Sequence, residues 1–403
     1  VSALAARFIG EYYKDADALG IRRADVAPLA TEHMPEIIGT AERIIEKGHA
    51  YVSDGDVYFD VRSWPGYGKL CKQGLDELEA GARVEVGERK RDPLDFALWK
   101  AQKPGEPAWD SPWGKGRPGW HIECSAMSSK YLGTTIDIHS GGVDLTFPHH
   151  ENEIAQSEAA SGKPFVRFWL HNGFLLIDKE KMSKSLGNFM TARAARQKYP
   201  PLAIRLFMLS AHYRSPINFA PEGLEQAERG VTRLRNCRAD LAFARKNRMS
   251  DEPGAGSFPA DFLEKLKRLD DDFHSAMNDD FNTAAALGVL FDVVHLVNTT
   301  LKDHETLPRA LPAGFFDAAE AELAKIDGIL GVIGPEELPK EKGLGLAGEE
   351  GLGDAEVERL IEERCAARKA KDFARSDEIR AMLAERGVVL EDTPQGTRWK
   401  REI

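Results

Sequence analysis

Cysteine is scarce in this chain of 403 residues, which has only four: Cys71, Cys124, Cys237 and Cys365. They are widely spaced and form no C-x-x-C pair, which excludes a disulfide scaffold and suits a reducing cytoplasm. No run approaches the roughly 18 apolar residues of a membrane helix and no signal peptide is visible, so we expect no membrane span. The chain opens at Val1 inside a helical pattern, and we expect its natural start to lie upstream.

Excess positive charge is absent as well. The formal net charge is −11, so a nucleic acid could be bound only through local basic patches. The length supports roughly two to four domains. Composition and periodicity suggest the following division: 1–50, the helical start of an α/β domain; 51–118, an inserted subdomain; 119–200, the second half of the α/β domain; 201–333, a helical bundle; 334–354, a linker; and 355–403, a small tail module.

Hydrophobic periodicity predicts the elements of the first half. Helices are expected over residues 1–19 and 31–48, and a β-hairpin is expected over residues 50–59 around the turn Asp54-Gly55. A short strand follows at residues 96–99. From residue 120 onward helix and strand alternate, with strands at 135–138 and, buried, at 174–177, which predicts a parallel sheet.

The second half is predominantly helical in pattern. Amphipathic segments predict a bundle of helices at residues 201–211, 221–246, 261–277 and 283–301. The tail predicts a small α+β module, with helices at 355–371 and 375–386 and strands at 388–390 and 397–399. The expected fold class is therefore an α/β domain with a parallel sheet, then an α-helical bundle, then a small α+β C-terminal module.

A polar loop, residues 180–188, follows the predicted strand at 174–177. Open α/β sheets bind nucleotides at the carboxyl ends of their strands. Lys181 and Lys184 can place charge on phosphates there, and hydroxyls such as that of Ser183 can complete the cradle. On spacing alone, an ordinary polar loop with two solvated lysines stays open as the alternative.

A candidate metal site involves a predicted helix that starts near Pro148. His149 and Glu153 are four residues apart and share one helical face, and Cys124 could add a thiolate. Nitrogen, oxygen and sulfur donors together suit Zn²⁺. The alternative is that Cys124 is a small buried apolar side chain and that the helix start is merely charged.

Basic residues gather in the tail. If one helix continued through this segment, a single face would carry Arg364, Arg368, Lys371 and Arg375, and that face could bind phosphates. Trp399 could stack on an unpaired base. A solvated helix face and a tryptophan in the core of a small domain are the open alternatives.

Several motifs carry a resemblance to a known family. The run Lys181-Met182-Ser183-Lys184-Ser185 resembles the signature of class I aminoacyl-tRNA synthetases. The likeness to the bacterial cysteinyl-tRNA synthetases extends over essentially the whole chain, and its motifs lie at residues 95–100, 111–114, 119–127, 137–139, 147–157, 277–283, 366–372 and 394–399.

The resemblance implies a Rossmann-like catalytic domain and an ATP-dependent ligase. Such an enzyme activates L-cysteine with ATP and Mg²⁺ to cysteinyl-adenylate and transfers it to the 3′ end of tRNA(Cys), as a cytoplasmic monomer. One Zn²⁺ per chain would select the substrate, because a soft thiolate binds zinc far better than the hydroxyl of serine does. The bundle would contact the tRNA stem, and the tail module would bind the anticodon.

The resemblance also implies residue roles, carried over motif by motif. It assigns Cys124, His149 and Glu153 to zinc, Trp120 to the floor of the amino-acid pocket, His139 to a place beside the substrate, Asp144 to the adenosine, and Lys181, Ser183 and Lys184 to ATP. Lys181 and Lys184 would stabilise the charge that develops on pyrophosphate. The basic tail residues would then lie on the tRNA side.

Two family features are absent from the sequence. The His-Ile-Gly-His signature is missing, and so is the fourth zinc ligand, a cysteine near the amino terminus for which Cys71 is no substitute. We expect both to lie upstream of Val1, and a chain that truly starts there should fail to activate cysteine. Two alternatives follow: a non-catalytic tRNA-binding fragment, and the related ligase of mycothiol synthesis, against which the tail 355–403 argues.

Overall fold

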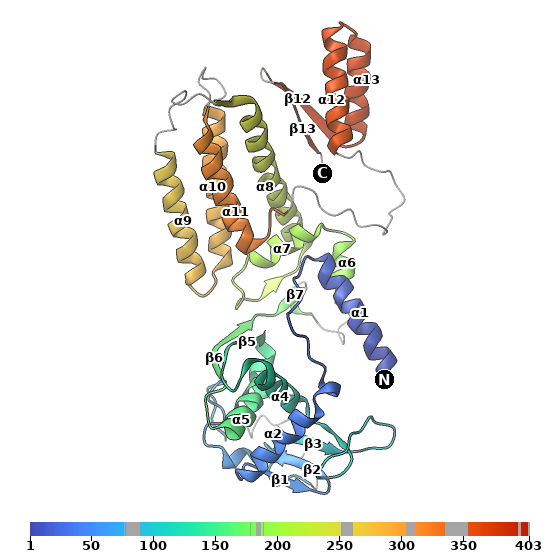
Figure 1. Ribbon diagram of the computed structural model, residues 1–403, viewed down its shortest axis with the longest axis vertical. Coiled ribbons are helices and arrows are strands. Elements are labelled where there is room, and N and C mark those ends of the chain that lie inside the picture. Colours follow the sequence, from blue (N-terminus) through green and yellow to red (C-terminus); the bar gives the residue numbers. More distant parts are fainter. Residues whose placement is uncertain are drawn as a thin grey trace. The chain divides into compact units, whose positions relative to one another are not determined.

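The computed structural model describes residues 1–75, 77, 89–177, 179–182, 187, 189–250, 261–303, 311–334, 354–393 and 396–401. It has two compact units (Figure 1). The first comprises Val1–Phe189 with Tyr213–Phe219, and the second comprises Met190–His212 with Ala220–Ile403. The two units are described in turn.

The first unit contains an antiparallel sheet in the region expected to be an insertion. Its strand order is β1 (Ala50–Ser53), β2 (Asp56–Phe59), β3 (Phe96–Ala101) and β4 (Gly116–Pro118). The predicted hairpin is confirmed, with Ala50 opposite Phe59. The short helical turn η1 (Ala30–Glu32) precedes helix α2, and η2 (Val61–Ser63) follows β2. Helix α1 (Ser2–Ala18) confirms the first predicted helix.

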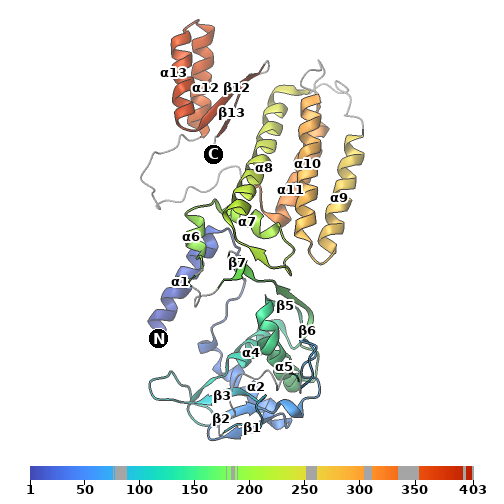
Figure 2. The ribbon, with the colours of Figure 1, turned by 180° about the vertical axis from the view of Figure 1, so that it is seen from behind.

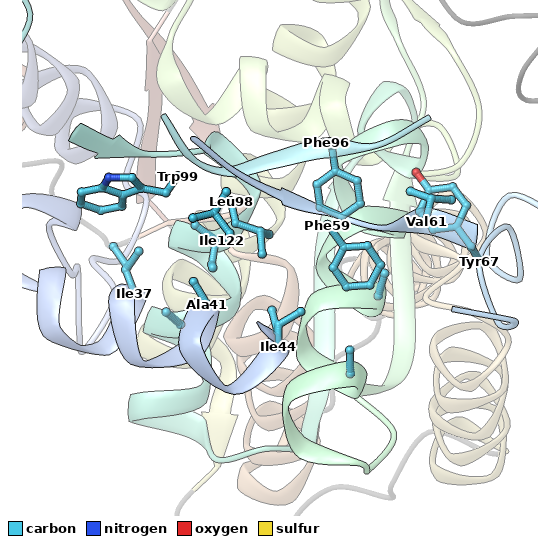
Figure 3. Close-up of a cluster of buried hydrophobic side chains, with 14 of the residues drawn as sticks. Ile37, Ala41, Ile44, Phe59, Val61, Tyr67, Phe96, Leu98, Trp99 and Ile122 are labelled. Atoms are coloured by element: carbon cyan, nitrogen blue, oxygen red, sulfur yellow. The ribbon is translucent and has the colours of Figure 1, made fainter. Parts of the chain in front are cut away.

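One apolar core joins this sheet to the helices (Figure 3). Helix α2 (Met34–Glu46) places Ile37, Ala41 and Ile44 against Phe59 and Leu98 of the sheet. Helices α4 (Trp120–Leu132) and α5 (Glu151–Ser161) add buried residues to the same core. The starts of α4 and α5 are therefore anchored to a rigid base.

A parallel pair of strands completes the α/β part of the unit. Strand β5 (Ile136–Gly142) pairs with β6 (Val166–Asn172), with His139 opposite Trp169. The connection runs through the turns η3 (Val143–Leu145) and η4 (Thr146–His150) and then α5. The predicted parallel arrangement and the strand near residues 135–138 are thus confirmed.

A smaller sheet has the order β8 (Glu180–Lys181), β7 (Leu175–Ile177), β9 (Ile217–Asn218), and β7 and β9 are parallel. The predicted strand at residues 174–177 exists, but its side chains are half-buried and not buried as expected. Antiparallel β8 and parallel β9 are its only partners among the described residues, so β7 is the middle strand of a sheet of three strands.

The second unit begins with α6 (Ala192–Arg196) and the helical bundle (Figures 1 and 2). The four predicted bundle helices are confirmed as α7 (Pro201–Leu209), α8 (Pro221–Arg248), α9 (Phe262–Asn278) and α10 (Thr283–Asp303). Prediction missed α11 (Ala313–Leu330), although its buried Phe315, Ala319, Leu323, Ile326 and Leu330 follow helical spacing. Strand β10 (Met249–Ser250), which follows α8, forms a short parallel pair with β11 (Leu311–Pro312), which directly precedes α11.

Among the described residues, one helix is long and apolar enough to cross a membrane: α10, with mean hydropathy 1.6 over its 18-residue window. In that window 44% of the residues are buried inside the structure. Its buried side chains include Leu290, Val293 and Val297, which alternate at helical spacing on one face. The core helix of a bundle has the same composition, so this feature gives only weak evidence for a membrane.

The tail forms the predicted α+β module. Helices α12 (Asp354–Lys369) and α13 (Phe373–Glu385) precede the antiparallel hairpin of β12 (Val388–Thr393) and β13 (Gly396–Arg401). Its core contains Val357, Leu360, Ile379, Leu383 and Val388. Residues 394–395, which connect the two strands, lie outside the described residues.

Candidate metal and amino-acid site

The start of α4 is held against strand β3 by a glycine. Gly119 precedes the helix, and its N–H donates to the carbonyl of Leu98 over 2.8 Å. A Cβ on Gly119 would lie 1.9 Å from the carbonyl oxygen of Ala97, so no side chain fits there. This close approach fixes the positions of Trp120 and of Cys124, one turn further on.

Three predicted ligands are brought together in the first unit. Ligand atoms of Cys124, His149 and Glu153 all lie within 4.8 Å of one another. His149 and Glu153 are buried and Cys124 is half-buried. The His149 Nε2 atom is 2.8 Å from Glu153 Oε1. A thiol, an imidazole and a carboxylate at this spacing can hold one divalent cation of the zinc type.

The protonation of the three groups suits a cation. Burial raises the pKa of Glu153, but the imidazoles of His139 and His149 outweigh it and lower the pKa to about 2. Burial, with Glu153 and Glu123 nearby, raises the pKa of the Cys124 thiol to about 12. Glu153 is thus ionised at neutral pH, whereas Cys124 keeps its proton unless a cation binds beside it.

His121 orients the ring of His149. The two Nδ1 atoms are 2.7 Å apart, so one ring donates and the other accepts. Burial, and then the neighbouring His149, lowers the pKa of His121 to about 4, which leaves His121 neutral and able to accept. His149 then carries its proton on Nδ1 and presents Nε2 as a ligand atom. Sequence reasoning missed this role, although His121 lies three residues before Cys124 on α4.

A second group of potential ligands shares Glu153. Ligand atoms of His139, His150 and Glu153 also lie within 4.8 Å of one another. His139 Nε2 is 3.0 Å from Glu153 Oε2, and His150 Nδ1 is 2.8 Å from His171 Nε2. The sequence analysis assigned a role to His139 but to neither His150 nor His171. His171 lies on β6 and meets His150 only through the packing of the folded chain.

Trp120 contacts the cluster, and Asp144 follows the strand that carries His139. The ring of Trp120 stacks on that of His149, and its side chain is 59% exposed. Asp144 is exposed in η3, just after β5, at the carboxyl end of a parallel strand. Open α/β sheets present ligand-binding groups at that end.

The lysine loop is only partly described. Lys181 lies on β8, where it pairs with Leu176 of β7. Ser183 and Lys184 lie outside the described residues, so their predicted positions stay predictions.

The predicted basic face of the tail is not formed, which corrects the sequence interpretation. Helix α12 ends at Lys369 and Lys371 has a φ of 60°, so Arg375 lies in a different helix, α13. The Arg364 side chain is 2% exposed and binds the Asp392 carboxylate through two nitrogens at 2.8 and 2.7 Å.

The other tail residues also have protein partners. Arg368 lies 3.0 Å from Asp392 and is half-exposed. Arg375 pairs with Glu363 and Glu378. Trp399 is half-buried against the module core, and its indole N–H donates to Glu358 over 3.1 Å. The core interpretation of Trp399 therefore fits its observed position.

Comparisons with known proteins agree with this architecture. A family model of the class I tRNA synthetase (C) catalytic domain matches residues 1–229, a DALR domain model matches 272–334, and a model of the cysteinyl-tRNA ligase anticodon-binding domain matches 352–399. The fold resembles Mycobacterium tuberculosis methionyl-tRNA synthetase in complex with methionyl-adenylate (TM-score 0.55, 16% identity, covering 82% of this chain and 77% of that one). Fold and family models thus define a class I aminoacyl-tRNA synthetase.

Curated relatives narrow the class further. The Geobacter sulfurreducens and Desulforudis audaxviator cysteine–tRNA ligases are each 52% identical over 99% of this chain and 82% of the relative. That of Geobacillus thermodenitrificans is 51% identical over 100% of this chain and 81% of the relative. The chain belongs to the cysteine–tRNA ligase family, whose members are ATP-dependent ligases that charge tRNA with cysteine. The predicted family and fold class are confirmed, and the anticodon-binding match argues against the mycothiol-synthesis alternative.

Proposed function

We propose that Cys124, His149 and Glu153 bind Zn²⁺ and that this site selects cysteine for ligation to tRNA(Cys). The supporting observation is the convergence of sulfur, nitrogen and oxygen within 4.8 Å, with Glu153 wholly buried. Zinc bound there would accept the substrate thiolate as a ligand and reject the hydroxyl of serine.

The remaining groups position the reactants. Trp120 forms the floor of the amino-acid pocket, and His139 lies beside the substrate on β5. Asp144 faces the adenosine of ATP. Charges on Lys181 and Lys184, with the hydroxyl of Ser183, hold the phosphates of Mg-ATP and stabilise the pyrophosphate as it leaves.

The reaction follows from this arrangement in two steps. The cysteine carboxylate attacks the α-phosphate of ATP, forming cysteinyl-adenylate and releasing pyrophosphate. A terminal ribose hydroxyl of the tRNA then attacks the acyl carbon and releases AMP. Neither step needs an enzyme nucleophile, so the chain contributes positioning and charge stabilisation.

The other regions serve the tRNA. Residues 1–50 and 119–200 form the catalytic domain, interrupted by the inserted subdomain 51–118. The bundle, residues 201–333, contacts the tRNA stem, and after the linker 334–354 the module 355–403 binds the anticodon. Within the module, the half-exposed Arg368 and the exposed Lys371 are better placed for phosphate contact than the buried Arg364. The protein acts as a cytoplasmic monomer.

Cysteine-dependent ATP–pyrophosphate exchange tests the proposal. We expect exchange with cysteine and not with serine, together with one tightly bound zinc per chain. The Cys124→Ser variant should lose both, whereas Cys71→Ser, which changes a half-buried thiol outside the ligand cluster, should keep both. A folded, zinc-loaded protein that binds tRNA but shows no exchange would favour the non-catalytic alternative.

A further inference from the structure

We propose that His139, His150 and Glu153 form a second divalent-cation site, joined to the first through the carboxylate of Glu153. The three residues come from β5, from η4 and from α5. The inference shares Glu153 with the proposed zinc site, but it depends on two histidines that this site does not use.

The carboxylate of Glu153 faces the two groups with different oxygens. Oε1 lies 2.8 Å from His149 Nε2, and Oε2 lies 3.0 Å from His139 Nε2. Beyond these ion-pair contacts, neither oxygen of Glu153 has a hydrogen-bond partner among the described residues, and neither does His139 Nε2. Buried polar atoms normally find such a partner. Imidazole nitrogens and carboxylate oxygens that approach one another in this way can converge on one cation.

His150 is held in the manner of a metal ligand. Its Nδ1 is 2.8 Å from His171 Nε2, which leaves its Nε2 free for a cation. Histidines that bind metals generally donate their other N–H to an outer partner, and His171 on β6 supplies one here. The pair formed by His150 and His171 parallels the pair formed by His149 and His121 on the other side of Glu153.

The backbone of β5 makes room for this ring. A Cβ on Gly141 would lie 2.8 Å from Cε1 and 3.1 Å from Nε2 of His150. Any side chain there would push His150 away from Glu153. Glycine at this position therefore preserves the convergence of the three ligands.

The donor set indicates which cations the site would take. Two imidazoles and one carboxylate suit Zn²⁺, Fe²⁺, Co²⁺ or Ni²⁺ and leave open coordination positions. The side chain of His139 is 21% exposed, although its Nε2 atom is buried beside Glu153. Because Glu153 is shared, each cation withdraws electron density from the carboxylate that serves the other. We therefore expect the second site, which has no thiolate, to bind more weakly than the first.

Titration of the metal-stripped, tag-free full chain with Co²⁺ tests the inference. A cobalt–thiolate charge-transfer band reports only the site of Cys124, whereas the d–d absorption reports both sites. We expect the charge-transfer band to saturate at one equivalent and the d–d absorption to rise until two. His150→Ala should bind one equivalent with the charge-transfer band intact. Cys124→Ser should bind one equivalent without that band.

Controls separate loss of the site from loss of the fold. His274→Ala changes a half-exposed histidine of the bundle and should leave two equivalents bound. If His150→Ala fails to fold, as judged by circular dichroism, His171→Ala replaces it, and we expect about 10–100-fold weaker binding at the second site only.

The outcomes distinguish this inference from the proposed function. If the wild type binds only one equivalent of Co²⁺, with a charge-transfer band, and His150→Ala or its substitute His171→Ala binds the same amount, the second site is overturned and the first is left intact. If the wild type binds Co²⁺ without a charge-transfer band, and His150→Ala no longer binds it, the second site is supported and the proposed zinc site fails.

Discussion

The indole ring of Trp120 lies on the imidazole ring of His149, with centroids 4.2 Å apart and planes inclined by 21°. Trp120 is the first residue of α4, and His149 lies in η4, two residues before the start of α5, so the contact joins the regions where two helices begin. One face of the indole is used by His149, and 59% of the side chain is exposed. The exposed part is available to a small ligand.

This stacking predicts the effect of changing Trp120. Trp120→Ala removes the stacking of Trp120 on His149, and an aromatic pair of this kind contributes about 0.5–1.5 kcal/mol. Because this contact holds the proposed floor of the amino-acid pocket, the KM for cysteine in pyrophosphate exchange should rise about 2–10-fold. Trp120→Phe, which keeps an aromatic face, should lie close to the wild type. The KM for ATP is the control and should not move. An equal rise in both KM values would contradict a specific role in the amino-acid pocket.

The sequence predicted the elements with strong local signals. The hairpin β1–β2 follows from the turn Asp54-Gly55 between alternating apolar residues, and α8 follows from a long amphipathic pattern. Two tail helices were predicted, at residues 355–371 and 375–386, so a shared basic face required one helix to continue through the gap between them. Lys371 instead adopts a positive φ, which no glycine or proline marks in the sequence. That single residue separates Arg364 from Arg375.

The candidate site shows the same limit. His149 and Glu153 could be paired because four residues on one helix share a face. His121 and His171 could not be assigned, because their partners are 28 and 21 residues away and meet them only through tertiary packing. Local spacing thus predicts ligands within one element, whereas outer partners depend on how elements pack.

His121 provides a second prediction. His121→Ala removes the group that fixes the proton of His149 on Nδ1, so zinc affinity should fall about 10–100-fold. Competition with a chromophoric chelator measures this affinity. His49→Ala is the matched control, since His49 is a half-buried histidine that contacts Ser63 and Trp64 and none of the candidate ligands. Equal losses of zinc affinity in the two variants would indicate general destabilisation and contradict the role assigned to His121.

Gly119 gives a third prediction, on stability. Gly119→Ala places a methyl group 1.9 Å from a backbone oxygen, so the chain must shift and the free energy of unfolding should fall by about 1–3 kcal/mol. Gly10→Ala is the control: nothing lies within 4 Å of a Cβ there, and the change within α1 should stabilise by up to about 1 kcal/mol. Denaturant titration measures both. Because Gly119 also positions Cys124, zinc affinity should fall in that variant alone.

The final prediction concerns pH and the tail module. Hydrogen bonding from Arg364 is the main cause that lowers the pKa of Asp392 below its ordinary value of 3.8, with Thr397 adding to it against the effect of burial. A carboxyl group whose pKa is lower in the folded chain stabilises the fold at pH values above its ordinary pKa. This stabilisation is lost as the pH falls below about 4 and approaches the lowered pKa. We therefore expect the protection of the β12 and β13 amides, corrected for the slower intrinsic exchange at lower pH, to fall on acidification, and to fall less in Asp392→Asn.

Arg364→Ala separates the ion pair from other effects of acid. Breaking a buried pair costs about 3–5 kcal/mol, but Asp392 is one-third exposed, so about 2 kcal/mol is expected for the module at neutral pH. Arg359→Ala, which removes an exposed partner of Glu356 on the same helix, should change stability by less than about 0.5 kcal/mol. Hydrogen exchange of the full chain, resolved by segment, measures both. Pyrophosphate exchange, which needs no tRNA, should be unchanged in Arg364→Ala while the KM for tRNA rises. Loss of pyrophosphate exchange together with protection in β12 and β13 would show that the pair supports more than the anticodon module.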